Sequence, residues 1–263
     1  MMRKHSLIRL SGLVAVAVLV FLSSSRAQSA EKWEWELTPY LWASGVRADV
    51  SIDGDPTIGA DATFSELVDD LDVAGMLHFE GRHGKLGFFT DAIFISLSDE
   101  QTRSADPPLP GGTQTESELE MGIYEAGGFY RPSGKEFGFD FLYGLRFIDF
   151  DQDISVTIPP PVSASTSLEA SSLYTDGIVG ARYSMPMGKR WYFVIRGDVG
   201  AGDANLEWNG VVTFGFKCDQ KGKYIVNGGY RYFKVDLDDE DNGVDVESDL
   251  TLQGPYIGFT FKF

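Results

Sequence analysis

Apolar and polar residues alternate along most of this chain with the two-residue period of a half-buried β-strand. The clearest example runs from Glu136 to Phe150. One face carries large apolar side chains, at Phe137, Phe139, Phe141, Tyr143, Leu145 and Phe147. The other face carries Leu142 among small or polar residues: Glu136, Gly138, Asp140, Gly144 and Arg146. From Phe137 to Phe147 a strand measures about 33 Å. Tilted by ~45° it rises ~23 Å, which fits the apolar band of an outer-membrane barrel.

Two further segments repeat this division of faces. Trp191, Phe193, Ile195 and Val199 oppose Tyr192, Arg196 and Asp198. Val73, Leu77 and Phe79 oppose His78, Glu80 and Arg82. A soluble β-sandwich also alternates, but it turns its largest side chains inward and covers its outer face with Lys, Glu and Thr. The mixture of glycine, arginine and carboxylate on the polar face instead suits the crowded lumen of a membrane barrel.

Short turns alternate with longer acidic or proline-rich segments, as they do in outer-membrane barrels. The short turns contain Gly84, Gly134, Gly188 and Gly222, and the long loops are expected at residues 53–71, 101–114, 157–166 and 238–246. Ten strands follow, at about 33–52, 72–83, 85–100, 115–131, 136–156, 167–184, 190–204, 209–218, 223–237 and 247–263. The predicted fold class is all-β, a single antiparallel transmembrane up-and-down barrel, with eight or twelve strands as alternatives.

The segment 53–71 is the least regular part of this prediction. Thr57 to Phe64 has the composition of an additional strand. Ser65 to Leu71 indicates one short helical turn with Ser65 as its N-cap.

The first 27 residues have the features of a secretory signal peptide. Three cations among residues 1–9 precede an apolar run from Leu10 to Leu22, which is too short to span a bilayer. Ser25-Arg26-Ala27 favours cleavage after Ala27, with cleavage after Ala30 or an uncleaved anchor helix as alternatives. The predicted domains are therefore a signal peptide, residues 1–27, and a barrel, residues 28–263.

Composition narrows the possible functions. The predicted signal peptide holds four cations and no anion, so the remaining 236 residues carry 18 cations and 39 anions, a net charge of −21. Such an acidic chain would repel a phosphate backbone, which argues against nucleic acid as a partner. After the signal peptide, no apolar run is long enough for a transmembrane helix. Cys218 is the only cysteine, which excludes an intramolecular disulfide.

Several segments resemble a group of uncharacterised proteobacterial outer-membrane β-barrel proteins. These segments are Trp33 to Gly45 (WEWELTPYLWASG), Phe64 to Asp72 (FSELVDDLD), Gly229 to Tyr232 (GYRY) and Gly254 to Phe259 (GPYIGF). The resemblance covers most of the chain after residue 27. It implies the fold and the cell outer membrane as location, and no particular activity.

The last strand indicates how such a barrel reaches its membrane. Ile257, Phe259, Phe261 and Phe263 share one face, and the chain ends on an aromatic residue. This is similar to the signal that the outer-membrane assembly machinery recognises by pairing with a strand edge. The expected partners are therefore this machinery, outer-membrane lipid and lipopolysaccharide, and the expected oligomeric state is a monomer.

Ionisable residues on the polar faces are the candidate functional residues. They are His78, Glu80, Arg82, Asp140, Arg146, Arg182, Arg196 and Asp198, and Asp91 and Arg231 are further candidates. One interpretation is an ion-pair network that fills a narrow barrel. The other is a constricted channel whose charged rings select small polar solutes.

A few residues are candidates for catalysis or metal binding. Serine hydrolysis needs a histidine base, and the chain after residue 27 offers only His78 and His83, both near the predicted periplasmic end. Asp238, Glu240, Asn242 and Asp249 partly follow the spacing of a calcium loop, although position 12 is Asp and no helices flank it. A weak Ca²⁺ or Mg²⁺ site competes there with a solvated acidic loop, and no other cofactor is expected.

The sequence thus predicts a non-enzymatic integral outer-membrane barrel with a structural or envelope role and a lumen filled by side chains. The alternatives are a narrow channel for small polar solutes, and a surface binder of cations or other ligands acting through its acidic loops.

Overall fold

A computed structural model describes residues 32–52, 55–69, 71–103, 113–158, 164–241 and 244–263. The predicted signal peptide lies outside this range, and Trp33–Phe263 form one compact unit. This unit contains the strands β1 (Glu34–Trp42), β2 (Gly45–Ile52), β3 (Asp55–Ala62), β4 (Leu71–His83), β5 (Leu86–Arg103), β6 (Thr113–Tyr130), β7 (Gly138–Ile158), β8 (Ala164–Met187), β9 (Trp191–Gly202), β10 (Leu206–Lys217), β11 (Tyr224–Asp241) and β12 (Val244–Lys262). It also contains the helix α2 (Phe64–Asp69).

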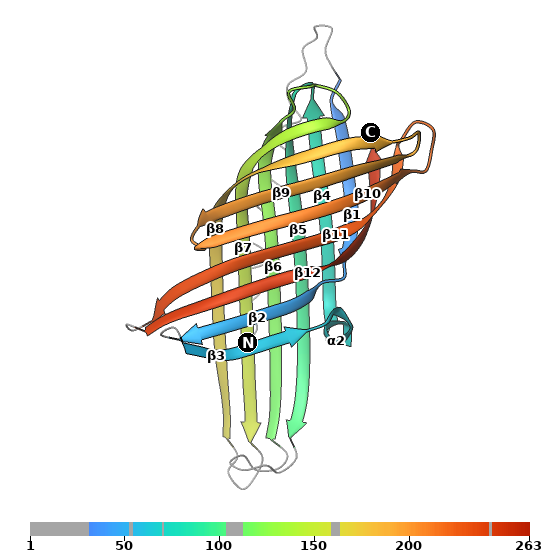
Figure 1. The fold of residues 1–263 in the computed structure, drawn as a ribbon. Helices are drawn as coiled ribbons and strands as arrows, with labels where there is room; N and C mark the ends of the chain where they lie inside the picture. The colour runs from blue at the N-terminus through green and yellow to red at the C-terminus, as the bar shows by residue number, and fades with distance from the viewer. Residues whose placement is uncertain (1–31, 53–54, 70, 104–112, 159–163, 242–243) are drawn as a thin grey trace, which may run out of the picture. The chain divides into compact units, whose positions relative to one another are not determined.

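Ten of the described strands close into an antiparallel barrel (Figure 1). Each strand from β4 to β11 pairs with the next strand in the sequence, and β1 closes the ring by pairing with both β4 and β12. The predicted fold class and the count of ten barrel strands are confirmed. The strands β2 and β3 are additional, because β2 pairs with Val246–Gln253 of β12 and β3 pairs with β2.

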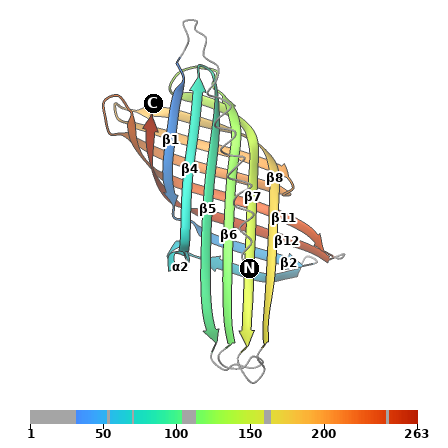
Figure 2. The same cartoon turned by 180° about the vertical axis from the view of Figure 1, so that it is seen from behind.

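The two ends of the barrel differ. At one end, tight turns at Gly84, Gly134, Gly188 and Gly222 place each glycine at a φ between 61° and 87°, a region that other residues rarely adopt. The last residue lies at this end too, where the backbone N–H of Phe263 bonds to Trp35 O at 3.0 Å. We call this the short-turn end and the opposite one the long-loop end. Around the long-loop end, β5 to β8 project beyond the other strands (Figure 2).

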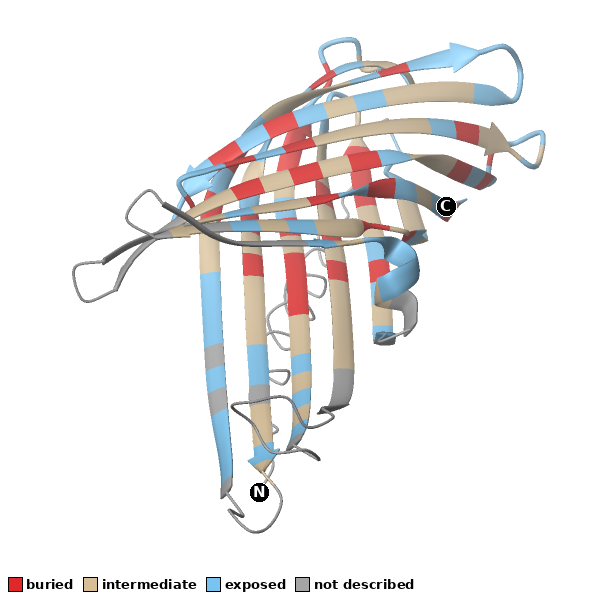
Figure 3. Cartoon of the chain, turned by 60° about the horizontal axis from the view of Figure 1, so that its bottom comes forward, coloured by how far each residue is buried: buried red, intermediate tan, exposed pale blue. Residues whose placement is uncertain are grey.

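The outer face of the barrel wall is apolar. Phe141, Tyr143 and Leu145 on β7 have exposed fractions of 53%, 55% and 48%, while Asp140, Leu142 and Arg146 between them are buried. Buried residues gather where the strands enclose the lumen, and the projecting ends of β6 to β8 are mostly exposed or intermediate (Figure 3). Among the described residues, no helix combines the length and the apolar character needed to cross a bilayer.

The prediction of a single strand over residues 33–52 is wrong, because Ala43 and Ser44 are not in a strand and separate β1 from β2. Proline explains where β1 leaves β4. Their ladder ends at the Pro39–Leu77 pair, and proline has no N–H to donate. Beyond this point β12 pairs first with the end of β1 and then with β2.

The segment 53–71 contains the additional strand that was predicted near Thr57 to Phe64, as β3, and the helical turn, as α2. The predicted N-cap Ser65 is wrong. The cap is Thr63, whose carbonyl accepts the backbone N–H of Leu67 at 3.1 Å. The backbone N–H of Thr63 in turn donates to Glu66 Oε2 at 2.7 Å. This bond and a second one from the Thr63 hydroxyl lower the pKa of the Glu66 carboxyl below its usual value.

Two further corrections concern strand ends. The loops expected at 101–114, 157–166 and 238–246 are shorter, because β5 to β8, β11 and β12 continue as polar ribbons. Phe137 does not belong to the outer aromatic row, because β7 begins only at Gly138, whose φ is 152°. The ring of Phe137 lies instead beside Tyr192 in the lumen, with their centroids 5.9 Å apart.

Candidate functional site in the barrel lumen

The inward side chains form three successive zones along the lumen. A cavity of about 220 Å³ lies at the short-turn end, where residues near strand termini such as Glu34, Arg131 and Lys262 line it. Buried ion pairs centred on Arg146 form the second zone. Buried apolar side chains form the third, toward the long-loop end. We call the second zone the ion layer and the third the apolar layer.

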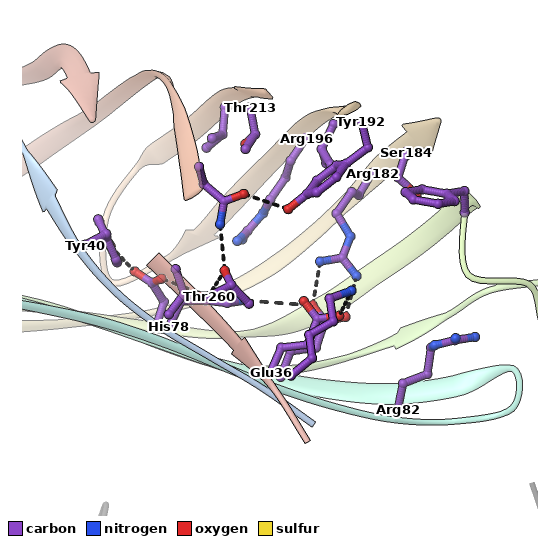
Figure 4. A pocket seen from close by; sticks show the side chains of 18 of the residues that line it. Glu36, Tyr40, His78, Arg82, Arg182, Ser184, Tyr192, Arg196, Thr213 and Thr260 are labelled. Carbon is purple, nitrogen blue, oxygen red and sulfur yellow. Dashed lines mark hydrogen bonds and ion pairs between the residues drawn. The ribbon is translucent and has the colours of Figure 1, made fainter. Parts of the chain in front are cut away.

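Uncharged polar side chains form part of the cavity wall (Figure 4). The Tyr192 hydroxyl donates to Asn227 Oδ1 at 2.6 Å, and Asn227 Nδ2 donates to Thr260 Oγ1 at 2.6 Å. Thr260 shares a 2.6 Å hydrogen bond with Thr38. These bonds join β9, β11, β12 and β1, so they bind the wall together across the strand that closes the barrel.

Arginine and carboxylate side chains form the opposite part of the wall. Arg131 donates two hydrogen bonds to the Asp140 carboxylate, of 2.5 and 2.8 Å. Arg182 reaches the same carboxylate at 2.8 Å and also Glu80, at 2.6 and 3.1 Å. Arg82 bonds to Glu34 and to the carbonyl oxygens of Gly84, Gly134 and Lys135. Arg82 therefore holds two of the short turns together.

His78 connects this part of the wall to the ion layer. Its Nδ1 lies 3.0 Å from Asp91 Oδ2, and its Nε2 lies 3.8 Å from Glu80 Oε2. Asp91 Oδ1 accepts the Tyr40 hydroxyl at 2.8 Å and lies 3.4 Å from Arg231 Nη1. With a carboxylate near each of its two nitrogens, the imidazole serves to join charged groups.

Arg146 is the centre of the ion layer. Its guanidinium donates to Glu125 Oε1 at 2.9 and 3.1 Å, to Asp198 Oδ1 at 2.6 Å and to Glu207 Oε1 at 2.7 Å. The side chains of all four residues have an exposed fraction of 0%. Charged groups in this state persist only when they are paired, because removing an ion from water costs several kcal/mol.

Arg196 and Arg231 complete the ion layer from either side of Arg146. Arg196 bonds to Asp198 and Glu125, both at 2.7 Å. Arg231 bonds to Glu125 at 3.1 Å and to Asn209 Oδ1 at 2.9 Å. Five strands, β6, β7, β9, β10 and β11, thus contribute to one hydrogen-bonded group that crosses the lumen.

The apolar layer covers the ion layer on the side of the long-loop end. Its buried members are Trp42, Met76, Ile93, Met121, Ile123, Ile148, Ala204, Phe233, Val235 and Leu252. The two layers touch through rings, because Arg146 lies 5.2 Å from the Phe233 centroid and Arg231 lies 5.2 Å from the Trp42 centroid. Such cation–π contacts favour a desolvated guanidinium.

The structure places all eight predicted lumen residues inside the barrel. Glu80, Arg82, Asp140, Arg182 and His78 line the cavity or contact its wall, and Arg146, Arg196 and Asp198 lie in the ion layer. Asp91 and Arg231, the two further candidates, join them. The prediction did not include Glu125, Glu207 or Arg131. Glu125 shares a mixed face with Ile123 and Phe129, Glu207 fell between two predicted strands, and Arg131 was the last residue of one, at the start of a turn.

In the acidic segment, residues 238–241 and 244–249 belong to the paired strands β11 and β12. Asp238 pairs with Glu247 and Glu240 with Asp245 in the β11–β12 ladder. Asn242 lies outside the described residues. Asp249 Oδ2 lies 3.3 Å from Lys234 Nζ. Within the described residues no group of three or more His, Cys, Asp or Glu side chains is arranged to hold a metal. The weak Ca²⁺ or Mg²⁺ site at Asp238, Glu240, Asn242 and Asp249 stays a prediction.

Comparison with known proteins gives a coarse answer. No family model matches the chain, and no curated protein matches it. Outer-membrane β-barrel proteins are its structural neighbours. One is the outer membrane protease OmpT from Escherichia coli, with 7% identity over 91% of this chain and 99% of that one and a TM-score of 0.44. Two others are Ail, the attachment invasion locus protein of Yersinia pestis, and the Pseudomonas putida toluene transporter TodX.

The sequence identities and TM-scores of Ail and TodX are similarly low. Ail is 10% identical over 89% of this chain and 99% of its own, with a TM-score of 0.31. TodX is 7% identical over 89% and 90%, with a TM-score of 0.36. These neighbours are a protease, an attachment invasion protein and a transporter, and their low similarity transfers no activity to this chain.

Proposed function

We propose that this chain is a non-enzymatic integral protein of the outer membrane whose lumen is closed, and that it serves a structural or envelope-maintenance role. The observation that carries the proposal is the succession of the ion layer and the apolar layer across the lumen. A solute that entered the cavity would have to break ion pairs whose side chains have an exposed fraction of 0%, and then pass buried apolar side chains.

The apolar outer face supports a membrane location. A soluble barrel would expose polar side chains there, whereas this wall exposes Phe141, Tyr143, Leu145, Val179 and Ile195. Closed barrels satisfy every backbone hydrogen bond within the wall, as lipid requires. In outer-membrane barrels the short turns and both termini face the periplasm, so the short-turn end is the periplasmic end of this barrel. We further propose lipid and lipopolysaccharide as surroundings, the assembly machinery as the partner of the last strand, and a monomeric state.

Liposome swelling in small polar solutes tests the closure. Liposomes that contain the folded wild-type barrel are expected not to swell. A variant with Arg146→Ser, Glu207→Ser and Phe233→Ser is expected to swell, because it shortens three side chains within the two closing layers.

A matched variant controls for lost volume. Arg182→Ser, Glu80→Ser and Tyr192→Ser remove the same kinds of side chain from the cavity wall and leave both layers in place. This variant is expected to stay closed. Swelling of the wild type, or of this control, would favour the alternative function, a narrow channel for small polar solutes.

A further inference from the structure

Two buried acids approach β9 from its two neighbouring strands where the ion layer meets the apolar layer. Asp176 on β8 and Glu207 on β10 both have an exposed fraction of 0%, and both lean over β9 between them. A Cβ on Gly200 would stand 2.2 Å from Glu207 Oε1, and a Cβ on Gly202 would stand 2.8 Å from Asp176 Oδ1. Gly200 and Gly202 are successive positions on one face of β9, so the two carboxyl groups approach the same face of that strand at positions two residues apart.

Each carboxyl group has one oxygen with a partner and one without. Asp176 Oδ1 accepts the backbone N–H of Ala204 at 3.0 Å, and Glu207 Oε1 accepts Arg146 Nη1 at 2.7 Å. Asp176 Oδ2 and Glu207 Oε2 are buried and have no hydrogen-bond partner among the described residues. A buried carboxylate oxygen without a donor is costly, so the two free oxygens indicate that a proton or another positive group satisfies them.

The charges around the pair agree with a missing positive charge. Arg146 is the cross-strand partner of Asp176, yet its guanidinium is directed to Glu125, Asp198 and Glu207. The layer holds three guanidinium groups, of Arg146, Arg196 and Arg231. It holds three carboxyl groups, of Glu125, Asp198 and Glu207, and Asp176 beside the layer adds a fourth.

Neighbouring titratable groups do not supply the missing charge. Arg231 also contacts Asp91, which pairs with His78 as well. Asp203, in the β9–β10 turn, adds a negative charge nearby and accepts the backbone N–H of Thr175 at 2.9 Å.

We propose that Asp176 and Glu207 hold one proton between them. A hydroxyl at Glu207 Oε2 that donates to Asp176 Oδ2 satisfies both free oxygens with a single hydrogen bond and balances the layer at three charges of each sign. A proton is favoured over a metal ion because the described residues offer no group of three acidic, His or Cys ligands. This site is additional to the closed lumen, since it makes the stability of the ion layer depend on pH.

The sign of this dependence follows from linkage. The folded barrel keeps the proton at pH values at which an exposed carboxyl has lost it, so the folded state binds one proton more than the unfolded state. The equilibrium constant for unfolding therefore rises with pH, by up to about tenfold per pH unit while the folded pair stays protonated.

Urea unfolding of the protein refolded in detergent micelles, between about pH 5 and about pH 9, tests the proposal. Glu207→Gln replaces the hydroxyl by an amide that donates at every pH. Relative to this variant, the wild type is expected to lose stability as pH rises, by at least about tenfold in the unfolding constant. Glu36→Gln, which changes an acid in the cavity wall, is expected to follow the wild type. His78 is present in all three proteins, so its titration cancels in the comparison.

Infrared spectroscopy provides a readout that does not depend on stability. The wild type and Glu207→Gln should differ by the C=O stretch of one protonated carboxyl group at neutral pH, and Asp176→Asn should abolish or shift the same band. Equal pH slopes for the wild type and Glu207→Gln, or no such band in the wild type, would overturn the proposal. Swelling at one fixed pH tests closure separately, so the two proposals fail independently.

Discussion

Arg146 shows at the scale of one residue what holds the lumen together. Four of its N–H groups are directed to three carboxylates contributed by three other strands, and its own side chain has an exposed fraction of 0%. Removing a partner from such a group leaves uncompensated buried charges, which costs more than the pair itself contributes.

We therefore expect Arg146→Ala to lower the free energy of unfolding by about 3–5 kcal/mol. Equilibrium urea unfolding in detergent measures this change. Arg47→Ala is the matched control, because Arg47 pairs with Asp61 at 2.9 Å while their side chains are 56% and 65% exposed. The control is expected to leave stability almost unchanged. Equal losses of unfolding free energy in the two variants would show that the buried network contributes no more than an exposed ion pair.

Glycines in the wall offer a second test, of packing. A Cβ on Gly127, which faces the lumen, would lie 2.3 Å from Tyr143 O and 2.8 Å from Phe89 Cζ. A Cβ on Gly197, which is exposed, meets no atom within 4 Å. Gly127→Ala is expected to cost roughly 1–3 kcal/mol and Gly197→Ala less than ~0.5 kcal/mol. Thermal unfolding midpoints compare the two, and an equal cost would contradict the assigned faces of β6 and β9.

Alternation within strands allowed the sequence to predict which residues face the lumen. Asp140, Arg146, Arg196 and Asp198 stand opposite clean aromatic rows, and parity alone places them inside. Glu125 was missed because Ile123 and Phe129 share its face, which gives that strand two half-apolar faces. Only the register of β6 against β7, where Glu125 is the cross-strand partner of Arg146, reveals its role.

At the scale of elements, the β1–β4 seam is the shortest part of the closed wall. Its ladder runs only from the Glu34–Arg82 pair to the Pro39–Leu77 pair. Past it, the backbone N–H of Trp42 bonds to the Met76 sulfur at 3.1 Å in place of a strand partner. Aromatic rings cover the seam at the short-turn end. Trp35 stacks on Trp33 and Phe79 with centroids 5.0 and 5.7 Å apart.

Trp35→Ala should therefore destabilise the barrel by roughly 2–4 kcal/mol, because it removes three aromatic contacts, the third with Phe88 at 5.8 Å. Trp191→Ala is the comparison, since Trp191 is another outward tryptophan and contacts one ring, Phe216 at 4.9 Å. Its expected cost is about a third of that. Denaturant midpoints measured in the same detergent compare the two variants. A larger loss of stability in Trp191→Ala than in Trp35→Ala would rule out a special role for the rings at the seam.

The ends of elements were harder to predict than their existence. The loops were predicted too long because the acidic residues beyond the apolar belt resemble loop sequence. In the structure, the strand pairs β5–β6, β7–β8 and β11–β12 continue into these acidic segments. Polar ribbons outside a membrane lack the apolar half of the alternation, so sequence pattern alone does not reveal them. The point at which β1 leaves β4 likewise depends on one proline, Pro39, in a run that otherwise reads as a single strand.

At the scale of the whole molecule, ten strands, the two distinct ends and the apolar exterior could be predicted from the sequence. The division of the lumen into cavity, ion layer and apolar layer could not. It depends on which side chains from strands far apart in sequence meet across the barrel, such as Arg231 and Tyr40. That arrangement separates a closed barrel from a constricted channel, since both have the same charged residues on the same faces.

Single-channel recording of the folded protein in a planar bilayer tests the central claim, a closed lumen, most directly. A closed lumen predicts no discrete current steps from the wild type under applied voltage. Discrete steps from the wild type, with a conductance that changes in Asp140→Ala or Arg196→Ala, would contradict it and identify the lumen as a conducting path.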